Sequence, residues 1–342
     1  MKLIIQIPCY NEAETLLVTL NDLPEHIDGI DTIEYLIIND GSSDETERIA
    51  KEWGVHHIVH HKRNLGLAKG FLNGIDLALR QGADIIVNTD ADNQYCGEDI
   101  AKLVQPILEK KADIVVGERP IDDIEEFSWM KKKLQRFGSK VVRIASKADI
   151  PDAPSGFRAY SRHAAMRMNV NNEYTYTLET LVQAGRNKMA IMSVPIRTNP
   201  ELRDSRLMNN IGSYIKKSAL TILRAILMYR PLQVFTIIGA VFMVLGSILG
   251  IRFLYFYFTG GGSGHVQSLI LTMLLIVIGV QSLMLAMQAD VISANRKLLE
   301  DVQFRVKKLE FGLLDAKGNA KATEQKEEEV TNGEENGAQE EW

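Results

Sequence analysis

The chain has 342 residues, with 39 Lys and Arg against 44 Asp and Glu and therefore a net charge of −5 at pH 7. This length accommodates one large domain or two smaller ones, and the lack of a basic excess argues against a nucleic-acid partner. Two cysteines, Cys9 and Cys96, are too few for a disulfide framework or a metal–thiolate cluster.

Apolar runs typical of strands alternate with helical patterns through the first 120 residues. The first run, "MKLIIQIP", is too short for the apolar core of a signal peptide and predicts a strand instead. Strands are expected at 2–8, 34–40, 55–61, 83–90 and 112–119, and helices at 12–23, 42–53, 66–80 and 100–110. This alternation predicts an α/β fold, with a mostly parallel sheet flanked by helices.

Polar clusters follow three of these expected strands. They are "PCYNE", "NDGSSD" and "TDADNQ", and each begins where an apolar run ends. Parallel sheets bind their ligands at the carboxyl ends of the strands. The sequence therefore predicts an active site within the first 120 residues. Each cluster would also serve as an ordinary turn or helix cap, which is the simpler alternative.

Asp90 and Asp92 lie in the third of these clusters, with one residue between them. Two carboxylates at this spacing repel each other unless a cation lies between them, and their hard oxygens suit Mg²⁺ or Mn²⁺. Because Mg²⁺ takes one or two carboxylates and completes its shell with water and substrate phosphates, the pair predicts a diphosphate substrate. Gln94 offers a further amide oxygen. The alternative is a solvated loop, in which the same spacing is common.

Two long apolar stretches lie near the C-terminus. Residues 232–258 and 268–289 are each long enough to cross about 30 Å of hydrocarbon; the alternative is a buried helical hairpin. Residues 210–229 have the amphipathic pattern of an interfacial helix. Lys and Arg flank the pair of stretches and are missing from the loop between them, so the positive-inside rule predicts two spans in the cell membrane with both ends cytoplasmic.

The end of the chain is polar and acidic. Residues 316–342 contain eight Glu and three Lys, a local charge of −5, and are expected to be disordered. The expected organisation is a catalytic domain at 1–209, interfacial helices at 210–230, a transmembrane hairpin at 231–290, an amphipathic helix at 291–315 and this tail.

The ordered set "IPCYNEAETL", "IINDGSSDET", "RNLGLAKGFLNG" and "NTDADNQ" resembles family 2 glycosyltransferases of the GT-A fold. Further along, "DAPSGFRAYSR", "YTYTLETLVQAGR" and "RDSRL", followed by two spans, resemble the branch that transfers sugars to polyprenyl phosphates. The resemblance covers residues 3–290. It implies a metal-dependent, inverting transfer from a UDP- or GDP-sugar to dolichyl or undecaprenyl phosphate on the cytoplasmic leaflet.

The resemblance also implies roles for individual residues. Those expected to bind the nucleotide sugar are Pro8, Tyr10, Glu12, Asp40, Asp90, Ala91, Arg203 and Arg206. The metal would be held by Asp92 and Gln94, and the catalytic set is Asp90, Asp92, Arg119 and Asp152. The acceptor phosphate would meet Arg119, Lys132, Arg136 and Ser139, although "KKKLQRFGSK" does not align cleanly with relatives there. Whether Asp152 acts as a base is left open.

Two other functions remain open on the sequence alone. A processive polysaccharide synthase shares the front half of the pattern but requires a Q-x-x-R-W motif, and the chain has Gln135-Arg136-Phe137 instead. A non-catalytic, lipid-binding membrane scaffold on the same fold would not need the intact acidic motif. The sequence does not name the sugar, the nucleotide, the polyprenol or the oligomeric state, and it leaves self-association and the role of the tail open.

Overall fold

The computed structural model describes residues 1–120, 150–170, 176–200, 227, 231–259 and 266–337, with side chains through Leu314. The chain divides into two compact units. The first comprises Met1–Leu207 and Val302–Trp342, and the second comprises Met208–Asp301.

The first unit is built on a seven-stranded sheet with the order β3-β2-β1-β4-β6-β5-β7. The strands are β1 (Lys2–Cys9), β2 (Thr32–Asn39), β3 (His57–His60), β4 (Ile85–Asn88), β5 (Ile114–Glu118), β6 (Arg158–Ser161) and β7 (Ile191–Pro195). β1, β2, β3 and β4 pair in parallel, as do β5 and β7. Within the described sheet only β6 runs antiparallel, to both of its neighbours β4 and β5. The predicted mostly parallel sheet with flanking helices is confirmed.

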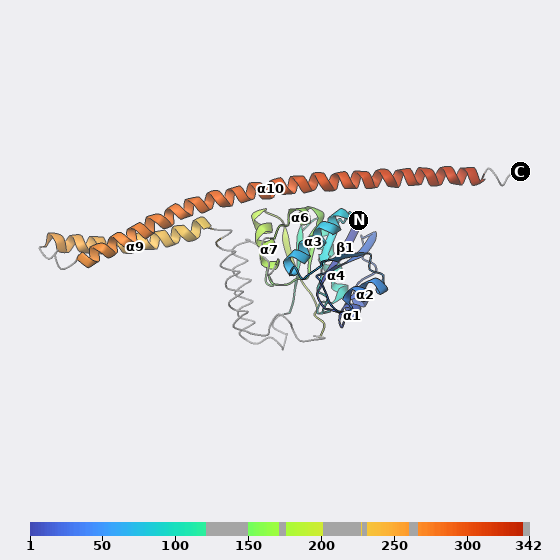
Figure 1. Ribbon diagram of the computed structural model, residues 1–342, viewed down its shortest axis with the longest axis horizontal. Helices are drawn as coiled ribbons and strands as arrows, with labels where there is room; N and C mark the ends of the chain where they lie inside the picture. The colour runs from blue at the N-terminus through green and yellow to red at the C-terminus, as the bar shows by residue number, and fades with distance from the viewer. Residues whose placement is uncertain (121–149, 171–175, 201–226, 228–230, 260–265, 338–342) are drawn as a thin grey trace. The chain divides into compact units, whose positions relative to one another are not determined.

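Helices cover both faces of this sheet (Figure 1). The helices of the first unit that are described in full are α1 (Leu16–Asp22), α2 (Thr46–Trp53), α3 (Leu67–Arg80), α4 (Ile100–Leu108), α6 (Arg162–Arg167) and α7 (Thr177–Arg186), with a 3₁₀ turn at Gly97–Asp99. Alternate β1 residues Leu3, Ile5 and Ile7 pack with α1, α2 and α4 in one core cluster. α3 packs on β1, β2 and α6. Fully buried side chains on both faces of the central strands explain their unbroken apolar runs.

Two details differ from the sequence-based expectation. The first helix begins at Leu16 rather than at residue 12, because residues 12–15 form a turn in which the amides of Thr15 and Leu16 both donate to the Glu12 carbonyl. The strand β6 was not predicted. Its four residues, "RAYS", lack a long apolar run, and its place between β4 and β5 depends on pairing with residues that are distant in the chain.

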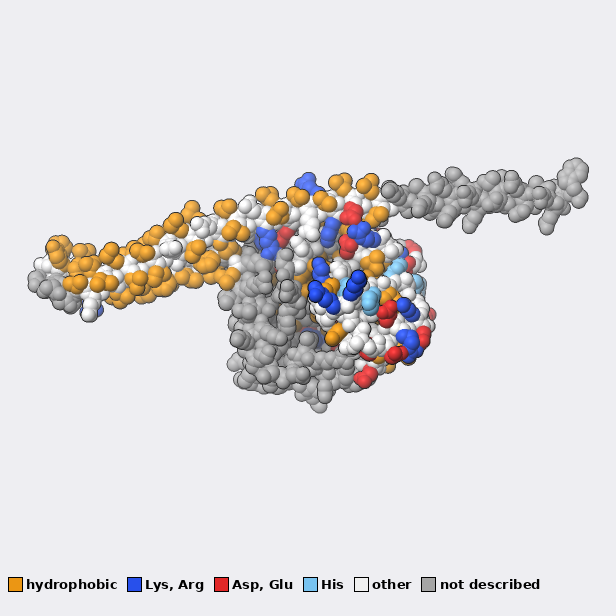
Figure 2. All heavy atoms as spheres, viewed as in Figure 1, with side chains coloured by type: hydrophobic (Ala, Val, Ile, Leu, Met, Phe, Trp, Pro, Cys, Tyr) orange, Lys and Arg blue, Asp and Glu red, His pale blue; other side chains and the backbone are white. Residues whose placement is uncertain are grey.

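The second unit contains α9 (Pro231–Phe258) and the first part of α10 (Val266–Gly337). Both helices are long and apolar enough to cross a membrane. Hydrophobic side chains run along their outer surfaces (Figure 2), and Ile237, Ile251 and Phe258 are 64%, 68% and 80% exposed. Apolar surface on this scale is not what the core helices of a soluble domain show. The predicted interfacial segment at 210–230 lies outside the described residues apart from Leu227.

The last part of α10 belongs to the first unit. The Phe304 ring lies under the Arg167 guanidinium of α6, 3.9 Å from its centroid. Arg80 of α3 pairs with Glu310 at 2.7 Å, and the Phe311 side chain is 1% exposed. In the structure α10 runs as one helix from Val266 to Gly337 and includes the residues of the amphipathic helix expected at 291–315, and the disorder expected from residue 316 stays a prediction.

Candidate active site

The candidate site lies at the edge of the sheet where the parallel strands end. β1, β2, β4 and β5 all run toward this edge, and β6, being antiparallel, begins there. Arg158, the first residue of β6, is in register with Asn88 of β4 and with Val116 of β5. The segment before Arg158 is therefore set between the residues that follow β4 and those that follow β5.

Asp90 and Asp92 follow β4 at this edge. Burial raises the pKa of Asp90 to about 7, and the negative charge of Asp92 acts in the same direction. The Arg119 guanidinium opposes this shift. A Cβ atom on Gly156 would lie 3.2 Å from Asp90 Oδ2, so glycine leaves room for the carboxylate. The pair thus carries a charge conflict that a cation would relieve.

The donor set of this loop fits a hard divalent cation. Asp92 Oδ1 accepts a hydrogen bond from the backbone amide of Gln94 at 3.2 Å. Asn93, which lies between them, has a φ of 56°, a conformation that asparagine tolerates. Within the described ranges no three His, Cys, Asp or Glu side chains cluster as a metal site. Two carboxylates and the Gln94 side-chain amide oxygen are donor types that suit an ion that completes its shell with phosphate oxygens and water, as Mg²⁺ does.

Arg119, just after β5, is held by Asp152. Its Nε and Nη2 donate to the two carboxylate oxygens of Asp152 at 2.7 and 3.1 Å. Asp152 is fully buried, and the Arg119 side chain is nearly so. Burial would lower the pKa of Arg119, but the acidic groups around it, among them Asp152 and Asp90, hold its pKa above the ordinary value. The pair therefore places a permanent cation beside Asp90, and the geometry makes Asp152 the group that orients Arg119.

Arg158 fixes the loop that carries Asp152. This arginine is fully buried and donates to the carbonyls of Ala153 and Ser155 at 2.6 and 2.8 Å. It also donates to the Thr177 carbonyl and the Thr180 hydroxyl of α7, at 2.8 and 2.9 Å. One guanidinium thus ties the 152–156 loop to α7, which keeps Asp152 at the edge of the sheet.

Two buried tyrosines, Tyr95 and Tyr176, contact residues of the site. The Tyr176 hydroxyl accepts from Asn88 Nδ2 at 2.8 Å, and burial together with the charge of Asp90 raises the pKa of Tyr176. The Tyr95 ring stacks on Phe157, with centroids 4.8 Å apart, and its hydroxyl accepts from the Gly156 amide at 3.3 Å. Sequence reasoning missed both tyrosines as site residues, although each belongs to or adjoins a motif that it singled out.

Cys9 also belongs to this region and was not foreseen as a site residue. Its thiol is buried, and burial raises its pKa, as do the negative charges of Glu12, Asp44 and Asp90. Three acidic side chains from the ends of β1, β2 and β4 are thus near enough to act on one thiol.

Of the residues expected to bind the nucleotide sugar, those that the structure describes lie at the ends of β1 and β2 and in the loop after β4. Pro8 is in β1, the Tyr10 side chain just beyond it is 45% exposed, and Ala91 is buried. The Glu12 amide donates to Thr46 Oγ1 at 2.9 Å, which ties the loop after β1 to α2.

Asp40 has structural partners as well. Its carboxylate accepts from His61 Nδ1 at 2.7 Å and from the amides of Leu65 and Gly66 at 2.8 and 2.9 Å. These bonds fold residues 61–66 against the end of β2. A contact of Asp40 with the nucleotide stays a prediction, and shaping this loop is a role that the sequence did not indicate.

Five of the expected site residues lie outside the described residues. They are Lys132, Arg136 and Ser139, expected at the acceptor phosphate, and Arg203 and Arg206, expected at the nucleotide sugar.

Comparison with known proteins places the chain in a family. The family model described as glycosyl transferase family 2 matches residues 4–168. The UDP-N-acetylglucosamine–dolichyl-phosphate N-acetylglucosaminyltransferase of Methanococcus voltae is 33% identical over 214 residues, which are 56% of this chain and 83% of the relative. The chain belongs to glycosyl transferase family 2.

Other comparisons agree with this result. The polyprenol monophosphomannose synthase of Mycolicibacterium smegmatis is 26% identical over 63% of this chain and 83% of its own length. Among solved structures, glucosyl-3-phosphoglycerate synthase from Mycobacterium tuberculosis with Mn²⁺, UDP-glucose and phosphoglyceric acid is similar in fold, with a TM-score of 0.53 at 18% identity, over 66% of this chain and 79% of that one. The predicted glycosyltransferase and its GT-A fold are thereby confirmed.

Proposed function

We propose that this family 2 glycosyltransferase moves a sugar from a nucleotide sugar to a polyprenyl phosphate at a membrane surface. The observation that carries the proposal is the Asp90–Asp92 pair beside the buried Arg119, because a divalent cation on the pair, together with Arg119, would supply the positive charge that a sugar diphosphate requires. The names of the relatives, with their dolichyl and polyprenol phosphates, and the two apolar helices support the lipid acceptor.

A lipid phosphate needs little help to become a nucleophile. A phosphate monoester has a second pKa near 6, so it is mostly a dianion at neutral pH. One of its oxygens attacks the anomeric carbon, the bond from that carbon to the diphosphate oxygen breaks, and the configuration inverts. No proton has to be removed from the nucleophile. This agrees with an Asp152 that is engaged by Arg119 rather than placed as a general base.

The chain's own residues stabilise the leaving group. Arg119, oriented by Asp152, offers a fixed positive charge near the diphosphate, where negative charge grows as the bond breaks. Asp92 and Gln94 would hold Mg²⁺ or Mn²⁺, which supplies further neutralisation of the diphosphate. Pro8, Tyr10, Glu12, Asp40, Asp90 and Ala91 would surround the nucleotide sugar together with Arg203 and Arg206, and Lys132, Arg136 and Ser139 would meet the acceptor phosphate.

The apolar helices give the reaction its location. We infer that α9 and the first part of α10 span the membrane and that the positively charged flanks keep the catalytic unit on the cytoplasmic side. An anchored enzyme meets an acceptor that cannot leave the bilayer. This arrangement would explain why a transferase of this family carries two apolar helices.

The test uses the full chain in membranes or detergent with Mg²⁺, a polyprenyl phosphate and labelled donors. UDP-N-acetylglucosamine comes first, because it is the donor in the name of the 33% identical relative, followed by UDP-glucose and GDP-mannose. Label should enter the organic phase from one donor, and EDTA or Asp92→Ala should abolish the transfer. Asp28→Ala, at a fully exposed carboxylate, is the matched control and should keep it. Donor binding without transfer would refute the lipid acceptor.

A further inference from the structure

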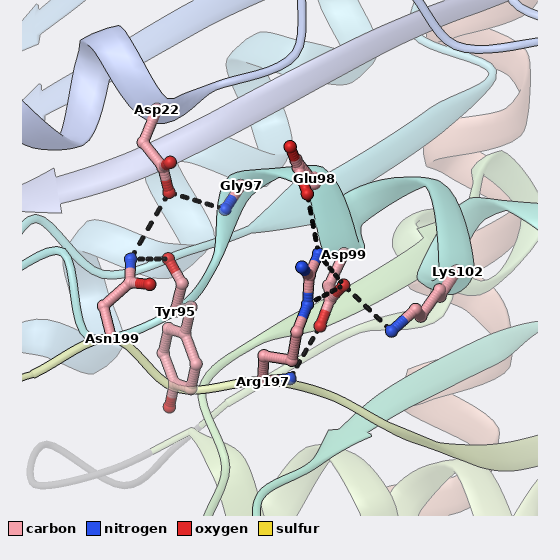
Figure 3. Close-up of polar contacts among 8 residues, drawn as sticks. All are labelled: Asp22, Tyr95, Gly97, Glu98, Asp99, Lys102, Arg197 and Asn199. Atoms are coloured by element: carbon pink, nitrogen blue, oxygen red, sulfur yellow. Dashed lines mark hydrogen bonds and ion pairs between the residues drawn. The ribbon is translucent and has the colours of Figure 1, made fainter.

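Two segments that are far apart in the sequence meet beside the predicted metal loop, residues 92–95. One is the 3₁₀ turn Gly97–Asp99 that follows this loop, and the other is residues 196–199, just after β7. Their contacts are drawn in Figure 3. We call this meeting point the junction and define it by Asp22, Gly97, Asp99, Arg197 and Asn199.

Asp99 is the centre of the junction. Its side chain is fully buried and accepts from three donors of Arg197: the backbone amide at 2.6 Å, Nε at 3.1 Å and Nη2 at 2.7 Å. Lys102 approaches the same carboxylate at 3.0 Å. Arg197 Nη2 also reaches Glu98 at 2.9 Å. Arg197 is thus held at both its backbone and its side chain, so the two residues that follow it have little freedom.

Those two residues hold the metal loop. The Asn199 amide donates to the Gln94 carbonyl at 3.0 Å, and Asn199 Nδ2 donates to the Tyr95 carbonyl at 3.4 Å. Tyr95 and Thr198 form an isolated antiparallel bridge. Gln94 and Tyr95 therefore take the position that residues 198–199 give them.

On its other side, the junction packs tightly against the end of α1. The Gly97 amide donates to Asp22 Oδ2 at 2.7 Å, where α1 ends. A Cβ atom on Gly97 would lie 1.9 Å from the Asp22 carbonyl oxygen, so only glycine fits. Asn199 Nδ2 reaches the same Asp22 carboxylate at 3.5 Å. The end of the metal loop is wedged between α1 and residues 197–199.

We propose that Arg197 is a positioning residue for the metal loop. Its bonds to Asp99 fix residues 198–199, which in turn set Gln94 and Tyr95 and so the spacing of Gln94 from Asp92. The inference rests on the proposed function in one respect, namely that this loop binds a divalent cation together with a nucleoside diphosphate. Arg197 itself contacts neither the cation nor the nucleotide and acts only through residues 198–199.

A merely stabilising role makes a different prediction. The Arg197 side chain is 56% exposed, but its partner Asp99 is fully buried, so losing the arginine would leave a buried carboxylate without its main counter-charge and lower stability. Arg48 on α2 resembles Arg197 in exposure and in its two carboxylate partners, since its side chain is 57% exposed and pairs with Glu45 and Glu52, but both of those carboxylates are exposed. If Arg197 served stability alone, Arg197→Gln would bind Mn²⁺ as tightly as wild type and as Arg48→Gln.

The experiment compares wild type, Arg197→Gln, Arg197→Lys and Arg48→Gln as full chains in detergent. Mn²⁺ binding is followed by electron paramagnetic resonance with UDP and, separately, with GDP, and amide hydrogen exchange is followed across residues 89–99 in metal-free protein. Arg197→Gln should exchange faster in this segment and bind Mn²⁺ about tenfold more weakly, the low end of the cost of losing a residue that supports metal ligands. Arg197→Lys should lie in between, because lysine keeps the charge but not the two-nitrogen geometry. Arg48→Gln should match wild type in both readouts.

The outcomes separate the inference from the proposed function. Unchanged exchange in Arg197→Gln overturns the inference whatever the metal does. Faster exchange with wild-type Mn²⁺ affinity overturns the link between the junction and the metal loop. A wild-type protein that binds no Mn²⁺ with either nucleotide overturns the metal-dependent function, and the inference with it.

Discussion

The Arg119–Asp152 pair offers the sharpest test of the site's construction. Both side chains are largely withdrawn from water, Asp152 completely, and they meet through two hydrogen bonds of 2.7 and 3.1 Å. Asp152→Asn keeps the shape of the side chain but removes the charge that balances Arg119. Arg119→Gln removes the other charge. Each single change leaves a buried charge without its counterpart.

The magnitude follows from burial. Removing one partner of a buried ion pair costs about 3–5 kcal/mol, whereas replacing both partners by neutral groups costs far less. For a folded unit of about 200 residues, 1 kcal/mol corresponds to about 2–4 °C in unfolding temperature. Each single variant should therefore unfold roughly 6–20 °C below wild type. The double variant Arg119→Gln/Asp152→Asn should recover much of this loss, because two amides can hydrogen-bond to each other.

Thermal unfolding in detergent, followed by tryptophan fluorescence, measures the effect. Trp53 is a suitable probe, because its ring meets Tyr35 of β2 edge-on with centroids 5.1 Å apart. Arg48→Gln serves as the control and should leave the unfolding temperature close to that of wild type, because its ion pairs are exposed. If the two single losses simply add in the double variant, the two side chains are not coupled and the reasoning is wrong. Sugar transfer should fall in all three variants, since each disturbs the cation beside Asp90.

Three further outcomes are expected. Gly97→Ala should lower the unfolding temperature sharply, because its Cβ would lie 1.9 Å from the Asp22 carbonyl oxygen, whereas Gly312→Ala on α10, with nothing within 4 Å, should be neutral or stabilising. Burial acts to raise the pKa of Asp99, but hydrogen bonds from Arg197 and Lys102 outweigh burial and hold this pKa below its ordinary value. The ionised form of Asp99 therefore contributes stability that is present above about pH 4 and is lost as the pH falls further. The unfolding temperatures of wild type and Asp99→Asn should accordingly converge on acidification, and parallel curves would contradict this. Phe311→Ala removes a side chain that is 1% exposed and should cost about 3 kcal/mol, measured in the same thermal assay; no change would show that this part of α10 does not pack on the first unit.

The strand ends show how far sequence reasoning reaches. The apolar runs at β1, β2, β4 and β5 and the acidic residues that follow them are local features, and a parallel sheet brings such ends to one edge by its geometry alone. The amino-acid order therefore suffices to place Asp90, Asp92 and Arg119 together. The apolar stretches near the C-terminus are equally local, because about 20 successive apolar residues have few other uses.

The tertiary structure decided what depends on pairing between distant residues. β6 has only four residues and no strong pattern, yet its antiparallel place between β4 and β5 brings Asp152, Gly156 and Arg158 to the site edge. The bidentate Arg119–Asp152 pair follows from that arrangement, whereas the contacts of Asp40 with His61 and of Arg197 with Asp99 follow from other pairings of distant segments. None of these pairs is visible in the sequence, because hydrogen bonds between side chains 21 to 98 positions apart leave no periodic trace. The sequence by itself determined which groups stand at the ends of the strands, and the packing of the chain decided which of them are held by the protein and in what orientation.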